Sequence, residues 1–474
     1  MTYKCNIDGV KTTLTSKLVN GATVPAPAYC TSEQSGTVAT TKSVANRLAT
    51  HKAPKLYNQL QLGWDEVAQA AYDRLYLWDM ATLPTAVIEH LPEYLGENGY
   101  IRNKNDNTII TFYFSSADWN IYDVNFTEAE LIKSLKADWI VKDVDGNCVK
   151  LFYIGNSQYT PGIWTYLRNI TNAELRNAIA DTVYEKIISS DYVDGIYFDW
   201  ASTSMSYLSN TTPAAAPGEI DLNGDGVGDT DEEIDALWTS SWKLLAQAVR
   251  NKVGGKLFQG NAGWENGYDY APYLNGIMIE QFMLGPLSFP ASYTWSSQMA
   301  NYAYYVVNGK SPVTSMLQAG GTQTNYDFMR FTLASALMFN GYYSYTNSSE
   351  GGLPYTATWW YDEYAVNISN GVAEEKLSYK GWLGKPLNDA YNVEDENEKL
   401  YDTLMLLDDS ADTKVWRRDY QHGIVICNPT DSTANVSLGG TYKKIDGVVD
   451  TSFNDGSSLT AISLASQRGA ILRS

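Results

Sequence analysis

Short apolar runs alternate with amphipathic helical stretches from about residue 56 to about residue 345. The runs are rich in β-branched and aromatic residues, which predicts strands. Eight runs fit this pattern: 74–79, 108–114, 150–154, 195–200, 256–261, 276–281, 312–318 and 341–345. Repeated β-α units predict a parallel sheet, and eight of them fit an α/β fold of the (β/α)8 TIM-barrel type. A doubly wound open sheet is the alternative, but no Gly-rich nucleotide fingerprint follows the first run.

Two further segments flank the predicted barrel, which we place at residues 56–411. Residues 1–55 are rich in Thr, Ser, Ala and Val and hold few large apolar side chains, so we expect no core of their own. This N-terminal extension is either an arm that docks onto something or a disordered leader. Residues 412–474 carry short strand-like runs separated by turn residues, which predicts a small antiparallel β domain.

The charge balance excludes several classes of partner. Lys and Arg number 34 and Asp and Glu number 54, which gives a net charge of −20. Nucleic acids and anionic membranes require a basic footprint that this chain lacks. No uninterrupted apolar run reaches about 18 residues, so no membrane insertion is expected. The first residues lack the order of a signal peptide, and we expect an extracellular or virion-associated protein.

Four cysteines are too few for a disulfide scaffold. Cys5 and Cys30 lie in one short segment and are candidates for a disulfide. Cys148 and Cys427 are far apart and are expected to be buried thiols. The cysteines therefore leave the redox compartment open.

Three of the runs end in a carboxylate: Asp79 follows the first, Asp199 the fourth and Glu280 the sixth. In a parallel barrel the carboxyl ends of the strands meet at one face, where the chemistry takes place. Two carboxylates facing one cavity are what glycoside hydrolysis requires, one as a proton donor and one as a nucleophile or base. The alternative is structural, because acids at strand ends also cap helices or pair with Arg. For Asp79 the expected role is a hydrogen bond to a sugar hydroxyl.

Aromatic and amide side chains lie near the same strand ends. Sugar rings stack on aromatic faces, although any single Trp is more often part of a core. The candidate platforms are Trp78, Trp119, Trp200, Trp264, Tyr345, Trp359 and Trp360. Asn261 and Gln318 also end strands and are candidates for binding hydroxyl groups.

Four segments carry a resemblance to a known family. They are Asp194-Gly-Ile-Tyr-Phe-Asp199-Trp200, Ile279-Glu280-Gln281-Phe282, Gly381-Trp-Leu-Gly384-Lys-Pro386-Leu, and Trp416-Arg-Arg-Asp-Tyr with Gly423-Ile-Val-Ile-Cys-Asn-Pro-Thr430. They resemble hypothetical glycosyl hydrolase family fifteen, over about residues 60–474. The resemblance implies a TIM barrel followed by a small β-sandwich.

By similarity to retaining barrels with an Asp after strand four and an acid after strand six, the resemblance also implies that Asp199 is the nucleophile and Glu280 the acid/base. The α-amylase-like barrels carry an Arg two residues before the nucleophile, where this chain has Tyr197. Residues 1–55 have no counterpart in the resemblance.

The segment 221–232 matches the twelve-residue calcium loop in full. The expected ligands are the side chains of Asp221, Asn223, Asp225, Asp229 and Glu232 and the carbonyl oxygen of Val227. Gly226 allows the sharp turn, and the carboxylates would repel one another without a cation. The sequence therefore predicts a structural Ca²⁺ that orders the loop after the fourth strand. The alternative is a solvated acidic turn before a helix.

Two functions from different classes fit these features. One is a glycoside hydrolase that acts on a poly- or oligosaccharide, with a retaining mechanism expected. The other is a non-catalytic glycan-binding or structural protein of an assembly such as a phage virion, in which residues 1–55 contact other protein chains. The separation of the two carboxyl groups distinguishes them. About 5–5.5 Å indicates retention and about 6.5–9.5 Å inversion, whereas a separation well beyond that, or a barrel mouth filled by side chains, favours the non-catalytic protein.

Overall fold

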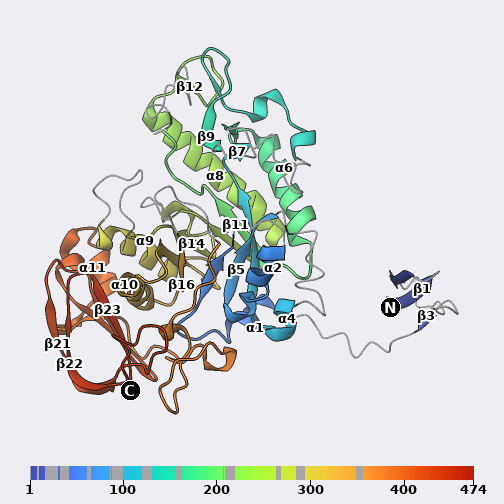
Figure 1. Cartoon of the computed structure of the whole chain (residues 1–474). Coiled ribbons are helices and arrows are strands. Elements are labelled where there is room, and N and C mark those ends of the chain that lie inside the picture. The colour runs from blue at the N-terminus through green and yellow to red at the C-terminus, as the bar shows by residue number, and fades with distance from the viewer. Residues whose placement is uncertain are drawn as a thin grey trace. The chain divides into compact units, whose positions relative to one another are not determined.

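A computed structural model gives the fold of the chain (Figure 1). It describes residues 2–7, 10–15, 30–31, 42–60, 66–85, 87, 100–119, 131–154, 163–206, 208, 219–262, 268–283, 294–347 and 356–474. The chain divides into two compact units, Met1–Ser43 and Val44–Ser474. Residues 44–55, which the sequence analysis groups with the N-terminal extension, lie in the second unit and include α1 (Val44–Leu48).

The first unit contains a small antiparallel sheet. Its strands are β1 (Thr2–Ile7), β2 (Val10–Thr15) and β3 (Cys30–Thr31), in the order β2-β1-β3. The register between β1 and β3 sets Cys5 opposite Cys30. A disulfide between these two residues stays a prediction.

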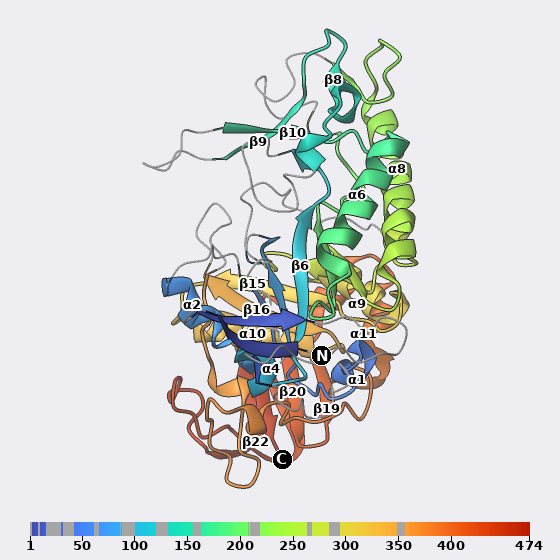
Figure 2. The same ribbon diagram turned by 90° about the vertical axis from the view of Figure 1, so that its right-hand side faces the viewer.

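The second unit is built on a parallel sheet of eight strands (Figure 2). In chain order they are β4 (Tyr57–Gln59), β5 (Met80–Leu83), β6 (Ile109–Ser115), β11 (Gly195–Asp199), β13 (Leu257–Gly260), β14 (Gly276–Ile279), β15 (Met316–Gly321) and β16 (Tyr342–Asn347). A parallel bridge between Leu56 and Tyr343 joins the last strand to the first. The predicted barrel of parallel strands is therefore confirmed.

Helices occupy the connections between successive strands. They are α2 (Glu66–Tyr72), α4 (Tyr100–Lys104), α6 (Ala173–Val183), the π-helical η4 (Tyr184–Ile188), α8 (Asp231–Val253), η5 (Tyr268–Tyr270), α9 (Trp295–Asn308) and α10 (Tyr326–Leu337). The α8 helix starts with a capping box, in which Thr230 and Glu233 satisfy each other's backbone N–H groups. The α6 and α8 helices pack side by side beside β6 and β11 (Figures 1 and 2).

Successive side chains on a strand point to opposite faces, so the barrel strands sort their residues into two sets. One set forms a buried cluster inside the barrel: Tyr57, Met80, Ile109, Tyr197, Leu257, Met278, Met316 and Tyr342. The other set, which includes Ile196, Phe198 and Phe258, packs outward against the helices. Asp199 and Glu280 each lie two residues after a member of the inner set, and Asn261 lies four residues after one. Their side chains therefore point to the same side as the inner set, at the carboxyl end of the barrel. The alternation therefore positions the candidate site.

Two of the predicted barrel strands are wrong. Leu75–Leu77, within run 74–79, is the 3-10 helix η1, and the strand that follows it is β5. Run 150–154 is β9 (Lys150–Ile154), which belongs to a separate antiparallel sheet in the order β7-β10-β9 with β7 (Asp118–Trp119) and β10 (Ile163–Leu167). The first barrel strand is β4, which has only three residues and is too short to stand out as an apolar run.

The connection from β6 to α6 forms an excursion from the barrel. It contains the β7-β10-β9 sheet, the 3-10 helix η3 (Ala137–Trp139) and β8 (Lys142–Asp143). Strand β8 pairs with β12 (Ile220–Asp221), which lies in the connection from β11 to α8. The segment predicted to bind calcium therefore starts at the end of β12.

The C-terminal part of the chain forms one antiparallel sheet of seven strands. They are β17 (Tyr391–Asn392), β18 (Asp395–Lys399), β19 (Trp416–Tyr420), β20 (Gly423–Asn428), β21 (Ala434–Lys443), β22 (Ser458–Leu464) and β23 (Arg468–Arg473), in the order β18-β17-β19-β20-β23-β21-β22. The β-rich domain is confirmed. Hydrogen bonds join its strands into one sheet, in which β21 meets β23 at the pair Lys443 and Arg473, and the two-sheet sandwich stays a prediction. One face encloses a small core of its own. The other face lies on α10, where a Cβ on Gly469 would come within 2.6 Å of the Ala334 Cβ.

Short helical segments link the barrel to this sheet and lie within it. They are η6 (Asp362–Tyr364), η7 (Leu377–Tyr379), α11 (Leu400–Leu404) and η8 (Asp409–Thr413). In the part of the chain that the structure describes, none of the helices has the length and apolar character needed to cross a membrane.

Candidate active site

Asp199 is the last residue of β11, the fourth barrel strand. Its Oδ2 accepts a hydrogen bond of 2.7 Å from the Tyr113 hydroxyl on β6. Its Oδ1 accepts from the Trp200 backbone N–H at 2.8 Å and from Asn261 Nδ2 at 3.0 Å. All three donors are neutral, and together they hold the carboxylate in one orientation.

Glu280 follows β14, the sixth strand, and shares a partner with Asp199. The Asn261 amide donates to Glu280 Oε2 at 2.7 Å with the same nitrogen that donates to Asp199. Because one atom makes both bonds, Asp199 Oδ1 and Glu280 Oε2 are separated by no more than the sum of 3.0 Å and 2.7 Å, which is 5.7 Å. The structure thus brings together the two carboxylates that the sequence analysis selected, with Asn261 between them.

The residue after each carboxylate has a left-handed backbone. Trp200 has φ 60° and Gln281 has φ 53°, a conformation that non-glycine residues rarely adopt. Such strain costs of order 1–3 kcal/mol per residue and concentrates at functional sites. Both strands therefore turn sharply just beyond their carboxylate.

Burial dominates the electrostatics of this pair. It raises the pKa of Asp199 above its ordinary value, while the bonds from Tyr113, Asn261 and Trp200 oppose that rise. Burial also raises the pKa of the Tyr113 and Tyr197 hydroxyls, and the negative charge of Asp199 adds to it. Both tyrosines therefore stay protonated, and Tyr113 remains a hydrogen-bond donor.

Asp118 is a third carboxylate near the site, which the sequence analysis missed. It lies three residues past Ser115, the register partner of Asp199, and Ser116 N donates to the Asp199 carbonyl at 3.2 Å. Burial raises the pKa of Asp118, against the lowering effects of Arg168 and Ser115. Asp118 is difficult to predict as a site residue, because Ser-Ser-Ala separates it from the apolar run.

Comparison with known proteins assigns the chain to a family. The model of hypothetical glycosyl hydrolase family 15 matches residues 102–424. The chain belongs to this family. The match spans both Asp199 and Glu280, and no curated protein matches the chain.

Several solved structures of glycoside hydrolases are similar to this family member. The glycoside hydrolase domain of PelA from Pseudomonas aeruginosa is 10% identical over 62% of this chain and 95% of that one, with a TM-score of 0.37. The cyclic alpha-maltosyl-(1-->6)-maltose hydrolase from Arthrobacter globiformis is 11% identical over 90% of this chain and 100% of that one, with a TM-score of 0.42. The GH36 alpha-galactosidase AgaA from Geobacillus stearothermophilus is 10% identical over 89% of this chain and 55% of that one, with a TM-score of 0.39.

In this glycosyl hydrolase family member, the other predicted sugar-binding residues are dispersed. Gln318 lies on the inner phase of β15, and its Nε2 donates to Gln59 Oε1 at 3.3 Å. Trp200 and Trp359 are half-buried, and Trp359 packs against Tyr345, whose hydroxyl bonds to the Thr322 carbonyl at 3.2 Å. Gln318 and Trp200 therefore neighbour the carboxylates in the fold, whereas Tyr345 is turned to the outer phase.

Two of the predicted platforms are core residues. Trp119 is fully buried and stacks on Trp139 with centroids 6.4 Å apart, and Trp78 is buried with an edge contact to Trp360 at 5.8 Å. Their rings are enclosed by other side chains and present no open face. Trp264 lies outside the described residues.

Asp79 lies at the opposite end of the barrel. It precedes β5, where it accepts a bond of 2.7 Å from the Leu56 N–H and pairs with the buried Lys380 Nζ at 3.0 Å. Burial lowers the pKa of Lys380, although Asp79 opposes that effect. The structure therefore separates Asp79 from Asp199 and Glu280, because run 74–79 does not form a barrel strand.

The loop 221–232 folds around its own backbone. Asp221 accepts bonds from the N–H groups of Gly224 at 2.7 Å, Asp225 at 3.1 Å and Gly226 at 2.8 Å. The Asp229 carboxylate accepts from Leu222 N at 2.6 Å. Within the described residues, no group of three or more His, Cys, Asp or Glu side chains converges as a metal site would require. Calcium binding by this loop stays a prediction from the sequence.

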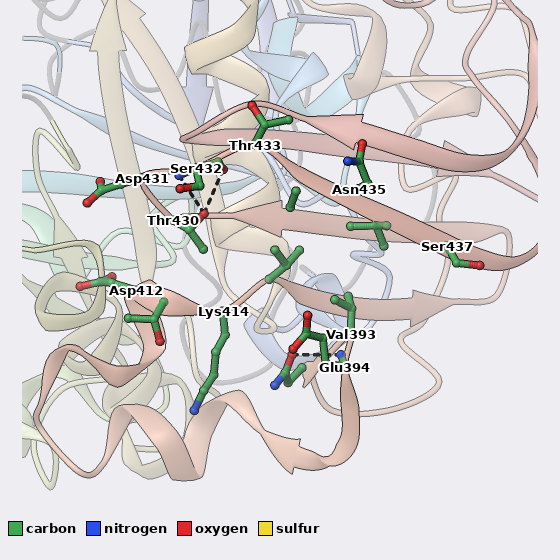
Figure 3. A pocket seen from close by; sticks show the side chains of 15 residues that line it. Val393, Glu394, Asp412, Lys414, Thr430, Asp431, Ser432, Thr433, Asn435 and Ser437 are labelled. Carbon is green, nitrogen blue, oxygen red and sulfur yellow. Dashed lines mark hydrogen bonds between the residues drawn. The ribbon is translucent and has the colours of Figure 1, made fainter.

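A cavity of about 660 Å³ lies in the C-terminal sheet, away from the carboxylates (Figure 3). Its lining is mostly polar and includes Asp412, Lys414 and Thr430. The Asp412 carboxylate accepts bonds of 2.8 Å from both the backbone N–H and the hydroxyl of Ser296, in the first turn of α9. Asp412 thus stabilises the start of a helix, and the catalytic candidates are those at the barrel.

Proposed function

We propose that this protein is a retaining glycoside hydrolase that acts on a poly- or oligosaccharide, with Asp199 as nucleophile and Glu280 as acid/base. The proposal rests on the single amide nitrogen of Asn261 that bonds to both carboxylates. The resulting limit of 5.7 Å between one oxygen of each group is close to the separation of about 5–5.5 Å in retaining enzymes. An inverting enzyme needs about 6.5–9.5 Å, to hold a water molecule.

In the first step, Glu280 donates its proton to the glycosidic oxygen while an Asp199 oxygen forms a bond to the anomeric carbon. The bond between that carbon and the leaving oxygen breaks, and a glycosyl ester on Asp199 results. In the second step, Glu280 takes a proton from water, and the water oxygen displaces Asp199 from the anomeric carbon. Inversion at each step leaves the configuration of the sugar retained.

The distribution of donors supports these roles. A nucleophile must be ionised, and Asp199 receives three hydrogen bonds that favour its charged form. Burial works in the other direction and keeps the carboxylate weakly solvated and therefore reactive. Asn261 holds the two carboxyl groups near each other. Both groups accept a hydrogen bond, so the amide must present its nitrogen and not its oxygen to them.

The anomeric configuration of the first product tests the proposal. A glycan library screened for new reducing ends would identify a substrate, and NMR of the anomeric proton early in the reaction would give the configuration. Retention is expected. Inversion would refute the nucleophile role of Asp199, and a library without any cleaved glycan would favour a binding or structural protein.

Replacing Tyr113 by Phe is expected to move the acid limb of kcat/KM to higher pH. The Tyr113 hydroxyl stabilises the charged form of Asp199. Without this donor the pKa of Asp199 rises further, and a higher pH is needed to ionise the carboxyl group. A hydrogen bond to a charged group contributes about 1.5–3 kcal/mol, which corresponds to a shift of roughly one to two pH units. Tyr345→Phe is the control, because its hydroxyl bonds to a carbonyl outside the site. A limb that stays in place or moves to lower pH contradicts the assignment.

Calcium binding by loop 221–232 is a separate proposal, and no catalytic step depends on it. If the ion binds only the folded chain, an excess of chelator is expected to lower the melting temperature by several degrees. An Asp225→Ser variant is the control, since it should melt at the lower temperature with or without chelator. Identical melting curves for the wild type in both conditions, with no calcium in elemental analysis, would disprove the prediction.

A further inference from the structure

Strand β21 of the C-terminal sheet has one unpaired edge. Over residues 434–437 it pairs with β22 on one side, and on the other side it meets β23 only at Lys443 and Arg473. Among the described residues, only β22 forms hydrogen bonds with the backbone of 434–437. Proteins usually protect such an edge with Lys, with Pro or with a covering element. The sequence Ala434-Asn-Val-Ser437 contains neither Lys nor Pro, so it does not keep another strand away.

The cavity in the C-terminal sheet lies along this unpaired edge (Figure 3). Its lining includes the four consecutive residues 434–437. Successive side chains of a strand point to opposite faces, so a cavity that borders four residues in succession borders an edge of the strand and not one face. Because β22 covers one edge, the cavity lies along the other. Its volume of about 660 Å³ is within the range of about 300–1,000 Å³ that is typical of ligand sites.

The opposite wall of the cavity is formed by residues 392–394 and 412–415, at β17 and before β19. There the chain is already paired, since the Val393 N–H donates to the Val415 carbonyl at 3.0 Å. The side chains of Val415 and Val436 are buried in the small core of the sheet, and Val393 packs against that core. The cavity therefore combines the unpaired edge of β21 with an apolar floor of three valines.

The charges around the cavity are mainly negative. Lys414 is neutralised by an ion pair with Glu398, and Asp412 already bonds to the start of α9. Glu394 and Asp431 are exposed on the lining, and neither carboxylate is bonded to another described residue. The rim therefore has two carboxylates that are available to a cationic partner.

We propose that the open edge of β21 binds an extended segment of a partner protein by strand addition, and that this segment alternates apolar residues with Lys or Arg. Its peptide groups pair with the backbone of 434–437, its apolar side chains cover the valine floor, and its cations reach Glu394 and Asp431. Since four residues of β21 border the cavity, the bound part spans about four residues, or roughly 14 Å at about 3.4 Å per residue. This site is separate from Asp199 and Glu280, and the inference does not depend on the proposed hydrolase.

Synthetic peptides test this inference with the full chain. The probe is a short fluorescent peptide that alternates Val with Lys, and its binding is measured by fluorescence anisotropy. One matched peptide has Glu in place of Lys, and another keeps every side chain but carries N-methyl groups on its internal amides. We expect each matched peptide to bind at least about tenfold more weakly than the probe, because one loses the charge attraction and the other loses the backbone donors.

Variants of the chain locate the binding. Asp431→Lys reverses a charge at the cavity, and Asp191→Lys reverses the same charge on an exposed side chain of the barrel. Asp431→Lys is expected to weaken binding of the probe by about threefold or more, whereas Asp191→Lys leaves it unchanged. Ala434→Phe, on the same phase as Val436, fills the cavity and is expected to abolish binding, with a thermal melt to show that the chain is folded. If this variant does not fold, the two charge variants and the N-methylated peptide decide.

Several outcomes overturn the inference. Equal affinity for the probe and its N-methylated form shows that the backbone is not paired, and equal losses from Asp431→Lys and Asp191→Lys show that net charge alone attracts the peptide. Absence of probe binding also overturns it. A dimer of the full chain that Ala434→Phe abolishes assigns the edge to a second copy, and displacement of the probe by a neutral oligosaccharide assigns the cavity to a glycan. Asp199→Asn should bind the probe as the wild type does, which keeps this test independent of the hydrolase.

Discussion

Asp199→Asn is expected to lower kcat by about 10⁴-fold or more while the melting temperature stays equal to that of the wild type or rises. The substitution removes the nucleophile but keeps the volume of the side chain. Burial raises the pKa of Asp199, so its ionised form is destabilised in the folded chain. A neutral amide at this position relieves that cost, which is a common relation between stability and activity. Initial rates on the glycan found by screening and a thermal melt would check both parts.

Asp191→Asn is the matched control for this experiment. Asp191 is exposed in the turn that leads into β11. Its replacement by Asn removes the same charge as Asp199→Asn, but at the other end of the strand. Its kcat and melting temperature should equal those of the wild type. If Asp199→Asn keeps more than a tenth of the activity, Asp199 has a structural role and the mechanism is wrong.

The barrel and the two carboxylates were predictable because both depend on alternation along a strand. The sequence Gly-Ile-Tyr-Phe-Asp puts Tyr197 and Asp199 on one phase, and Met278 and Glu280 share a phase in the same way. The wrongly predicted strands lie where a short element has no distinctive pattern of apolar residues. Strand β4 is three residues long, and Leu75–Leu77 is apolar because a 3-10 turn buries it.

These errors offset each other in the count of strands. Run 150–154 was counted as a barrel strand but pairs with β10 in another sheet, while β4 was not counted. The total remained eight, and Asp199 and Glu280 kept their places after the fourth and sixth strands. Only hydrogen-bonded register separates a barrel strand from a strand in an insertion, and register is not visible in one sequence.

The aromatic platforms were harder to predict than the acids. Both phases of a parallel strand are buried, so a ring that packs outward and a ring that faces the axis occur in the same apolar run. Tyr113 and Tyr345 illustrate this, since one donates to Asp199 and the other bonds to Thr322. The role of Asn261 could not be predicted either, because it requires two carboxylates from other strands to meet one amide.

The largest expected effect on stability comes from Arg330, which joins α10 to the C-terminal sheet. Arg330 is buried, its Nε bonds to Glu363 Oε1 at 2.7 Å, and its Nη2 bonds to Asp450 Oδ2. The guanidinium group also lies 3.9 Å from the centre of the Phe453 ring. Arg330→Met leaves two buried carboxylates without their cation, so the free energy of unfolding at pH 7 is expected to fall by about 3–5 kcal/mol.

The effect should depend on pH in a defined direction. Burial raises the pKa of Asp450, but bonds from Ser452 and Arg330 outweigh it and the net pKa is lowered. A carboxyl group with a lowered pKa in the folded state stabilises the fold above its unfolded pKa, near 4, and that contribution disappears as pH falls through the folded value. The difference between Arg330→Met and the wild type should therefore shrink below about pH 4.

Arg468→Met is the matched control, because Arg468 pairs with Asp327 at 3.3 Å where both side chains are 40% or more exposed. A surface pair of this kind contributes about 0–1 kcal/mol. Denaturant melts of the two variants at pH 7 and at low pH would give the four values needed. A second substitution, Glu363→Gln in the Arg330→Met background, should recover part of the loss, since it removes one uncompensated buried charge. If Arg330→Met is no less stable than Arg468→Met, packing alone attaches the sheet to the barrel and the buried ion pairs contribute nothing.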